Sequence, residues 1–264
     1  MDFKQLLGSE DEKPLDTLVT DGGFCGIFRT IGCIGDSLSS GEFEAIDAEG
    51  VKTYHDYFDY SWGQYLARLA GCTVRNFSRG GMTAKEYVNS FAEANGFWDT
   101  DKACSAYIIA LGVNDLCNQD TPVGSLDDVD FDNYKNNKPT FAGYYARIIQ
   151  AYKRIQPDAR FFLMTMPRQV NSPEQEARCA AHAALLQQFC ETFSNCYLLD
   201  FRTYAPVYDA FFYQNFAMGG HLTPAGYLLT GKMVASYIDY IIRHNIHDFD
   251  QVGFIGTQFQ YRAL

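Results

Sequence analysis

Three short polar segments of the chain carry side chains that could do chemistry together. Ser37 follows the apolar run 30–34, Asn114 follows the run 106–111, and His221 stands just before a well-marked helix start. A serine hydroxyl becomes a nucleophile when a base such as imidazole lies within hydrogen-bond reach. An asparagine amide is a neutral donor that titration cannot remove, and it can stabilise a developing oxyanion. If the fold brings them together, these residue types could form an acyl-transfer site.

The segment around Ser37 has two interpretations when it is taken alone. In Gly35-Asp36-Ser37-Leu38 the serine stands at the carboxyl end of a predicted strand, where it would project into a ligand crevice and offer its backbone N–H to an oxyanion. In the other interpretation, Asp36 and Ser37 only cap the segment that follows the strand. Asp36 and Asp115 are expected to support their turns through hydrogen bonds to the backbone rather than to react.

Four segments, in order along the chain, resemble the sequence blocks of the SGNH (GDSL-type) hydrolase family. They are Gly35-Asp36-Ser37-Leu38, a glycine segment at 76–83, an Asn-Asp segment at 111–115 and a histidine segment at 220–227. In the glycine segment Gly81 is the better match and Gly80 the alternative. Each segment alone is a weak signal, but the four together are specific.

The resemblance implies a role for each matched residue. Ser37 would be the nucleophile and His221 the base that takes its proton. The oxyanion donors would be the backbone N–H groups of Ser37 and Gly81 and the side-chain amide of Asn114. The supporting residues would be Asp36, Gly112 and Asp115. The family's chemistry is ester hydrolysis through a covalent acyl-serine, so we expect a small-molecule ester as substrate, no metal and no organic cofactor.

The histidine segment departs from the family pattern at one position. The family carries an aspartate three residues before the histidine, to orient the ring, and this chain has Met218 there. In a serine triad, disabling that aspartate costs about 10⁴-fold in rate. A backbone carbonyl could accept the Nδ1 proton instead, which gives a Ser–His dyad and is the solution that we favour. Alternatively, Asp209, Asp200 or a loop carboxylate takes its place; His55, at the end of a long connection, is a further residue that could reach the site.

Two other functions remain open, and two are disfavoured by the sequence. A catalytically impaired relative that binds acyl or carbohydrate ligands is one alternative, and a lysophospholipase-like lipid acylhydrolase is another. A flavodoxin-like nucleotide binder is disfavoured, because no glycine-rich phosphate loop follows a strand. The acidic segment 128–132 begins like a calcium loop, but Asn133 replaces the required glycine and Pro139 stands where the bidentate glutamate belongs, which favours a solvated loop.

Alternating strands and helices must position these residues. Apolar runs predict strands at about 30–35, 73–77, 106–111, 160–166 and 196–200, and helical periodicity predicts helices at about 56–70, 83–94, 141–156, 173–193 and 224–244. This alternation predicts an α/β fold with a parallel sheet covered on both faces. The resemblance implies a three-layer α/β/α sandwich with a flavodoxin-like sheet of about five strands. We expect a single domain over 1–264, with an N-terminal arm at 1–24 and a C-terminal extension at 248–264.

Two connections are longer than such a fold requires. They cover residues 38–54 and 116–140, and both leave the carboxyl ends of predicted strands, where open α/β sheets bind ligands. Aromatic side chains in and after the first connection could form a wall for a sugar or an acyl group, although half or more could equally belong to the core; they are Phe43, Tyr54, Tyr57, Phe58, Tyr60 and Trp62. We therefore lean towards short acyl esters, such as acetylated sugars.

Composition and charge bound the remaining possibilities. The chain has 264 residues, 47% of them hydrophobic, and 32 acidic against 21 basic side chains give a net charge of −11. Nucleic acids and anionic membranes are therefore unsuitable partners, and no apolar run approaches the roughly 20 residues of a membrane span. The N-terminus is polar and acidic and does not resemble a signal peptide, and the eight cysteines show no metal spacing. We expect free thiols in a reducing compartment, the cytoplasm.

Overall fold

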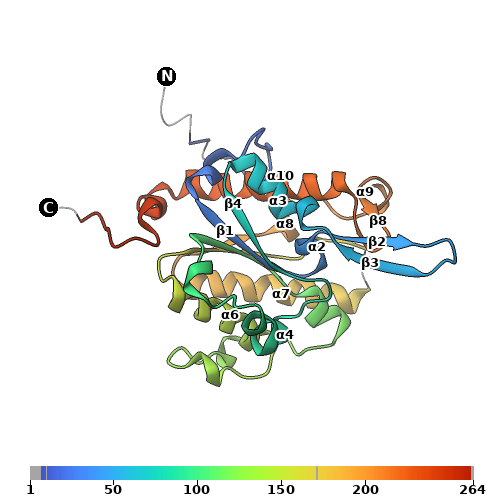
Figure 1. Ribbon diagram of the computed structural model, residues 1–264, viewed down its shortest axis with the longest axis horizontal. Coiled ribbons are helices and arrows are strands. Elements are labelled where there is room, and N and C mark those ends of the chain that lie inside the picture. The colour runs from blue at the N-terminus through green and yellow to red at the C-terminus, as the bar shows by residue number, and fades with distance from the viewer. Residues whose placement is uncertain (1–6, 10, 171, 263–264) are drawn as a thin grey trace.

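The computed structural model describes residues 7–9, 11–170 and 172–262. Its centre is a parallel sheet of five strands in the order β4-β1-β5-β6-β7, which Figure 1 shows between two layers of helices. The strands are β1 (Thr30–Gly35), β4 (Thr73–Ser78), β5 (Ala106–Ala110), β6 (Arg160–Met164) and β7 (Cys196–Leu199). Each lies within two residues of a predicted strand, and the predicted three-layer α/β/α fold is confirmed.

Long helices cover both faces of the sheet. Figure 1 shows α3 (Trp62–Ala70) and α10 (Pro224–His244) on one side, and α6 (Phe141–Ile155) and α7 (Pro173–Thr192) on the other. The predicted helix at 83–94 is a composite of α4 (Ala84–Glu86), a π-helical turn (Tyr87–Phe91) and α5 (Ala92–Ala94). The predicted helix at 56–70 begins later, at Trp62, after a short 3₁₀ turn.

Strand β1 shows why the sheet is buried on both sides. Ile31 and Cys33 belong to the hydrophobic cluster under α3 and α10, whereas Ile34 belongs to the cluster under α6 and α7. Successive side chains of a strand point to opposite faces, so a strand covered on both faces needs an almost continuous apolar run. This is the pattern that the sequence carries.

The start of α10 is fixed by its first residues. Thr223 accepts a hydrogen bond from the Gly226 N–H through its side chain, and Pro224 occupies the first turn. A proline there loses no hydrogen bond, since the first N–H groups of a helix have no partner within it. This cap, two residues after His221, thus fixes where α10 begins. At the start of α7, Ser172 and Gln175 form a capping box.

The first long connection is mostly regular structure, for which no helix or strand was predicted. It contains a single helical turn, α2 (Ser37–Ser40), and an antiparallel hairpin of β2 (Glu42–Ile46) and β3 (Lys52–Asp56) that projects from the body in Figure 1. All five residues of β3 are exposed, so no alternation of apolar and polar residues marks it as a strand.

Short elements near the C-terminal end of the sheet were not predicted either. They are α8 (Phe201–Tyr204), α9 (Ala210–Phe216), and the small hairpin of β8 (Ala217–Met218) and β9 (His221–Leu222). The second long connection begins within a π-helical turn (Asn114–Asn118) and continues with two 3₁₀ turns. Within it, Asp128 accepts hydrogen bonds from Lys138 and Thr140, 3.0 Å each, rather than standing free.

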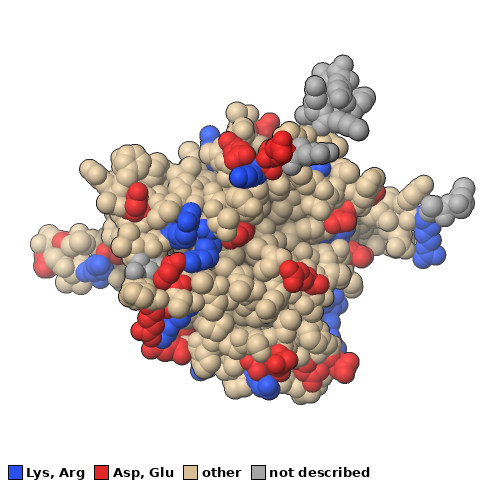
Figure 2. Space-filling view, turned by 180° about the vertical axis from the view of Figure 1, so that it is seen from behind, with Lys and Arg blue, Asp and Glu red and all other residues tan. Residues whose placement is uncertain are grey.

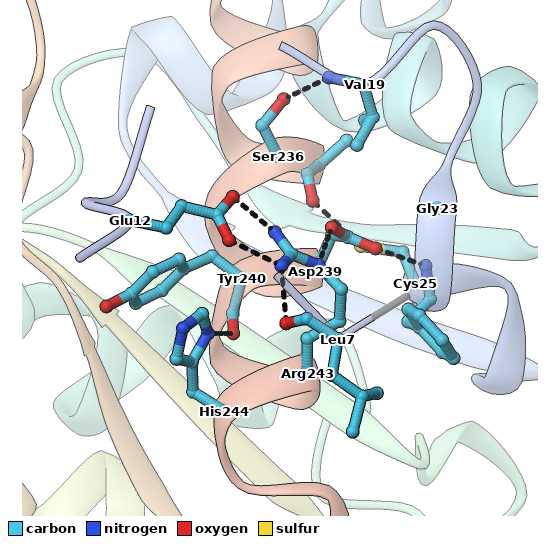
Figure 3. Close-up of polar contacts among 12 residues, drawn as sticks. Leu7, Glu12, Val19, Gly23, Cys25, Ser236, Asp239, Tyr240, Arg243 and His244 are labelled. Carbon is cyan, nitrogen blue, oxygen red and sulfur yellow. Dashed lines mark hydrogen bonds and ion pairs between the residues drawn. The ribbon is translucent and has the colours of Figure 1, made fainter. Parts of the chain in front are cut away.

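Parts of both terminal segments contact the sandwich; residues 1–6, 10 and 263–264 of the predicted arm and extension lie outside the described residues. Figure 3 shows Arg243 of α10 bound to Glu12 and to the carbonyl of Leu7, while the Val19 N–H donates to Ser236. At the other end, Phe249, Val252 and Ile255 are buried in the α3–α10 cluster. All eight cysteines are free. No helix within the described ranges is long and apolar enough to cross a membrane.

Candidate active site

Strand register brings the predicted site segments together. Gly35, at the end of β1, pairs with Ser78 of β4 on one side and with Ala110 of β5 on the other. The three segments that follow these strands therefore leave the sheet side by side. Each of them carries one of the residues predicted to act on a substrate.

A cavity of about 440 Å³ opens at this edge of the sheet. Ser37, Gly81, Asn114 and His221 all line it. Asp36 and Gly112 line it as well, whereas Asp115 is buried and lies outside the lining. The structure thus places in one cavity residues that are as much as 184 positions apart in the sequence.

Part of the cavity lining is apolar. It comes from the end of β6, from α8, from the segment that contains α9 and from β9: Met164, Met166, Phe201, Tyr208, Phe212 and Leu222. The expected wall from the first long connection is largely wrong, because Trp62 alone of those six aromatic residues lines the cavity. Phe43 packs edge-on against Tyr57 and Tyr60 instead.

Ser37 is held by the local geometry of its own turn. It is the first residue of α2, and Asp36 caps this turn by accepting a hydrogen bond of 3.1 Å from the Leu38 N–H. Gly41 closes the turn in the left-handed region, φ 77°, and donates to the Ser37 carbonyl. The Ser37 N–H is the first of the turn, so it lies outside the internal hydrogen bonds and can bind an anion.

Asn114 is oriented from both ends of its amide. Its Nδ2 donates to the Met82 carbonyl at 3.1 Å, and its Oδ1 accepts from Asn118 Nδ2 at 2.8 Å. An amide nitrogen carries two hydrogens, so one N–H of Asn114 remains for a ligand. Asn118 also lines the cavity and is a site residue that the sequence analysis missed.

The two glycines of the glycine segment have different surroundings. Gly81 adopts φ +70°, which favours glycine, and it lines the cavity. A Cβ on Gly80 would lie 1.9 Å from Glu42 Oε2, so this residue packs closely against Glu42. The geometry is consistent with Gly81 as the residue that faces a ligand.

Asp36 and Asp115 are both bound to backbone N–H groups. Asp115 accepts from the Ala84 N–H at 3.1 and 3.0 Å and thereby ties the Asn114 segment to the glycine segment. Burial raises the pKa of Asp36 to about 7, against the effect of the Leu38 N–H. Burial likewise raises the pKa of Asp115 to about 6, against the effect of the Ala84 N–H. Both carboxyl groups are thus placed to hold turns.

His221 lies between two carboxylates of strand β2. Its Nε2 is 2.9 Å from Glu42 Oε1, and its Nδ1 is 3.8 Å from Glu44 Oε2. The exposed fractions of the three side chains are 12%, 13% and 6%. The Tyr54 ring packs edge-on against the imidazole, with centroids 5.7 Å apart. Two acidic side chains therefore contact the predicted base from the hairpin that follows the predicted nucleophile.

Neither Asp200 nor Asp209, the two residues named as replacements for the missing aspartate, contacts His221 among the contacts that the structure gives. Met218 is 43% exposed and pairs with His221 across the β8–β9 hairpin. Asp200 binds Thr165 and the Thr203 N–H, and Asp209 caps α9. Within the described ranges His221 Nδ1 has no hydrogen-bond partner, so the favoured backbone carbonyl is not found. The nearest carboxylate to Nδ1 that the structure gives is Glu44, at 3.8 Å.

His55 does not contribute to the cavity. It lies on β3, where its Nε2 is 3.0 Å from Thr53 Oγ1 on the exposed surface of the hairpin. Among the described residues, no group of three or more His, Cys, Asp or Glu side chains is arranged to hold a metal ion.

Comparison with protein-family models gives one match. The model of the GDSL-like lipase/acylhydrolase family matches residues 33–229, which contain all four of the segments on which the sequence resemblance rests. No curated protein sequence matches the chain.

Solved structures share the fold at low sequence identity. A protein from Lactobacillus plantarum has a TM-score of 0.59 and 15% identity, over 83% of this chain and 98% of its own. A carbohydrate esterase family 2 enzyme with a carbohydrate-binding domain, from Corynascus thermopiles (Myceliophthora fergusii), has a TM-score of 0.55 and 17% identity, over 80% of this chain. A family two carbohydrate esterase from Clostridium thermocellum, in complex with cellohexaose, has a TM-score of 0.50 and 15% identity, over 83% of this chain. The match covers 65% of each of these two esterase chains.

Proposed function

Because the chain belongs to the GDSL-like lipase/acylhydrolase family and is a carboxylic ester hydrolase, we propose that it works through an acyl-serine intermediate formed on Ser37. The observation that carries the proposal is the shared cavity, in which Ser37, His221, Gly81 and Asn114 meet. A nucleophile, a base and neutral donors are the three components that acyl transfer needs.

The first half of the reaction forms the acyl-enzyme. Ser37 Oγ attacks the ester carbonyl carbon while His221 Nε2 takes the hydroxyl proton. The carbonyl oxygen becomes an oxyanion, which the N–H groups of Ser37 and Gly81 and the free N–H of Asn114 bind. His221 then gives the proton to the leaving alkoxide. These donors are fixed before the reaction, so they stabilise the transition state without reorganising.

The second half hydrolyses the acyl-enzyme. Water replaces the alcohol, His221 takes its proton, and the hydroxide attacks the acyl carbon against the same oxyanion donors. Proton transfer to Ser37 Oγ then releases the acid and restores the starting state. No step requires a group other than side chains, backbone and water.

The substrate class proposed is a short acyl ester of a neutral alcohol, such as an acetylated carbohydrate. The carbohydrate esterases named above support a sugar alcohol, and the carboxylate of Glu42 in the cavity disfavours an anionic substrate. The apolar wall around Phe212 favours a second candidate, an ester with a longer acyl chain, as in a lipid acylhydrolase.

Hydrolysis of a chain-length series separates the two candidates. Turnover of 4-nitrophenyl acetate, butyrate and octanoate is measured for wild type and for Ser37→Ala. We expect the highest kcat/KM for acetate and loss of all turnover in the variant. A kcat/KM that rises from acetate to octanoate would favour the lipid candidate, and undiminished turnover by Ser37→Ala would refute the acyl-serine mechanism.

A further inference from the structure

Strand β2 presents two carboxylates to His221, and their positions relative to the cavity differ. Glu42 and Glu44 are two residues apart, so they share one face of the strand. Glu42 lines the cavity together with Ser37 and approaches Nε2. Glu44 is not among the lining residues and approaches Nδ1. The imidazole therefore has one nitrogen towards the substrate side and one towards Glu44.

The two carboxylates also differ in how they are held. Glu44 is ion-paired with Lys52 of β3, and it accepts a hydrogen bond of 3.1 Å from the Gly220 N–H. The Lys52 ammonium, and then the Gly220 N–H, lower the pKa of Glu44, so this carboxylate stays charged. Burial raises the pKa of Glu42, and Asp56 is a further negative neighbour, while His221 acts in the opposite direction. Glu44 is thus the fixed anion, next to the residue that precedes His221.

We propose that Glu44 is the positioning residue of His221, in place of the carboxylate that position 218 lacks. This inference rests on the proposed function. The buried Nδ1–H of His221, which has no partner among the described residues, donates to Glu44 Oε2 once the 3.8 Å gap closes. Hydrogen bonds of catalytic groups are often long in a free enzyme and shorten in its substrate complex. Nε2 is then the nitrogen left to take the Ser37 proton.

The geometry also gives Glu42 a separate part in the cycle. At 2.9 Å it occupies Nε2 in the free enzyme, where Ser37 Oγ must bind during attack. Glu42 therefore has to leave Nε2 and take with it the proton that joins the two atoms, so that Nε2 has a free lone pair when substrate enters. Glu44 remains in place throughout, because Lys52 and the Gly220 N–H hold it. During attack the proton of Ser37 moves to Nε2, the ring becomes positive, and the Glu44 carboxylate stabilises that charge without taking a proton.

The two isosteric variants Glu44→Gln and Glu42→Gln test this division. We expect Glu44→Gln to lower kcat by about 10²-fold or more while KM changes little, because a positioning residue acts in the transition state. Glu42→Gln should lower kcat by about 10-fold at most. Glu49→Gln, at the exposed turn of the same hairpin, is the matched control and should behave as wild type. If Glu44→Gln keeps the wild-type kcat, or if Glu42→Gln loses as much, the proposal is wrong.

A second variant protects the test against a folding defect. If Glu44→Gln does not fold, Lys52→Met is used, since Lys52 is half exposed and its removal leaves the Glu44 carboxylate in place but less fixed. A partial loss of kcat at unchanged KM supports the proposal, and an unchanged kcat contradicts it. An inactive wild type with no reaction at Ser37 would instead refute the proposed function, so the two failures are distinguishable.

Discussion

Asn114 is the residue whose contribution can be isolated most cleanly. Asn114→Ala removes one neutral donor to the oxyanion and should lower kcat by about 10²–10³-fold with little change in KM. Asn118→Ala should cost less, because it removes only the partner that orients the Asn114 amide. Steady-state kinetics on 4-nitrophenyl acetate measures both. Equal losses in the two variants would contradict the assignment of Asn114 as the donor.

Asp36 should make the stability of the fold depend on pH. Its folded pKa of about 7 lies above the usual unfolded value near 3.9, so the folded state binds the proton more tightly. Between these two values stability falls as pH rises, and above the folded pKa it no longer changes on this account. Asp36→Asn keeps a capping oxygen but cannot ionise. As pH rises from roughly 4 to 8, the wild type therefore loses stability that the variant keeps. The free energy of unfolding of Asp36→Asn minus that of wild type should grow by about 1–3 kcal/mol over this range.

Urea unfolding at both pH values measures the difference. If the free energies of unfolding of wild type and Asp36→Asn differ by the same amount at roughly pH 4 and pH 8, the Asp36 carboxyl does not titrate as its burial implies.

Single residues differed in how far the sequence could predict them. Ser37 and Asn114 follow strands, and the ends of parallel strands meet at one edge, so their meeting follows from the order of apolar runs. Glu42 and Glu44 became site residues only through the pairing of β2 with β3 and the packing of that hairpin against β9. In the sequence, two glutamates separated by one residue in a polar segment do not indicate that they contact a histidine more than 170 residues away.

Among the elements, the tie between the N-terminal segment and α10 invites a direct test. Arg243 binds Glu12 at 2.7 Å and Asp239 at 2.8 Å (Figure 3). Asp239 also accepts a hydrogen bond from the Phe24 N–H. The three ionic side chains are 12%, 21% and 7% exposed, so they are poorly screened. Arg243→Ala should lower the free energy of unfolding by about 1–3 kcal/mol.

Arg262→Ala is the control for this prediction, because Arg262 contacts only Gln260 among the hydrogen bonds of the described chain and lies on an exposed segment. Denaturant titration compares the two variants. A loss in Arg243→Ala no larger than in the control would mean that the network adds nothing to stability.

The predictability of elements followed their burial. The five central strands and the helices that cover them bury continuous or periodic apolar faces, and these faces are visible in the sequence. The β2–β3 hairpin has an entirely exposed second strand, and α8 and α9 are only four and seven residues long. Such elements depend on tertiary contacts rather than on a periodic face, so local patterns could not reveal them.

At the scale of the whole molecule, the net charge of −11 bears on substrate choice. Figure 2 shows charges of both signs scattered over one face among uncharged residues. At the cavity the acids are concentrated: Asp36 and Glu42 line it, and Asp56 and Glu44 are negative neighbours that raise the pKa of Glu42. A negatively charged substrate approaching this edge is therefore repelled.

Matched esters test this effect. We expect kcat/KM for neutral 4-nitrophenyl acetate to exceed that for the 4-nitrophenyl monoester of succinate by about 10-fold or more at low ionic strength, and added salt to narrow the gap. Equal values for both esters at low salt would show that the acidic edge does not select substrates.

The central claim is that Ser37 is the nucleophile and that His221 activates it. A fluorophosphonate reacts covalently with an activated serine, and peptide mass spectrometry locates the adduct. We expect a single adduct on Ser37, its absence in Ser37→Ala, and labelling slowed by about 10²-fold or more in His221→Ala. An adduct on another residue, or none on an enzyme that hydrolyses 4-nitrophenyl acetate, would contradict it.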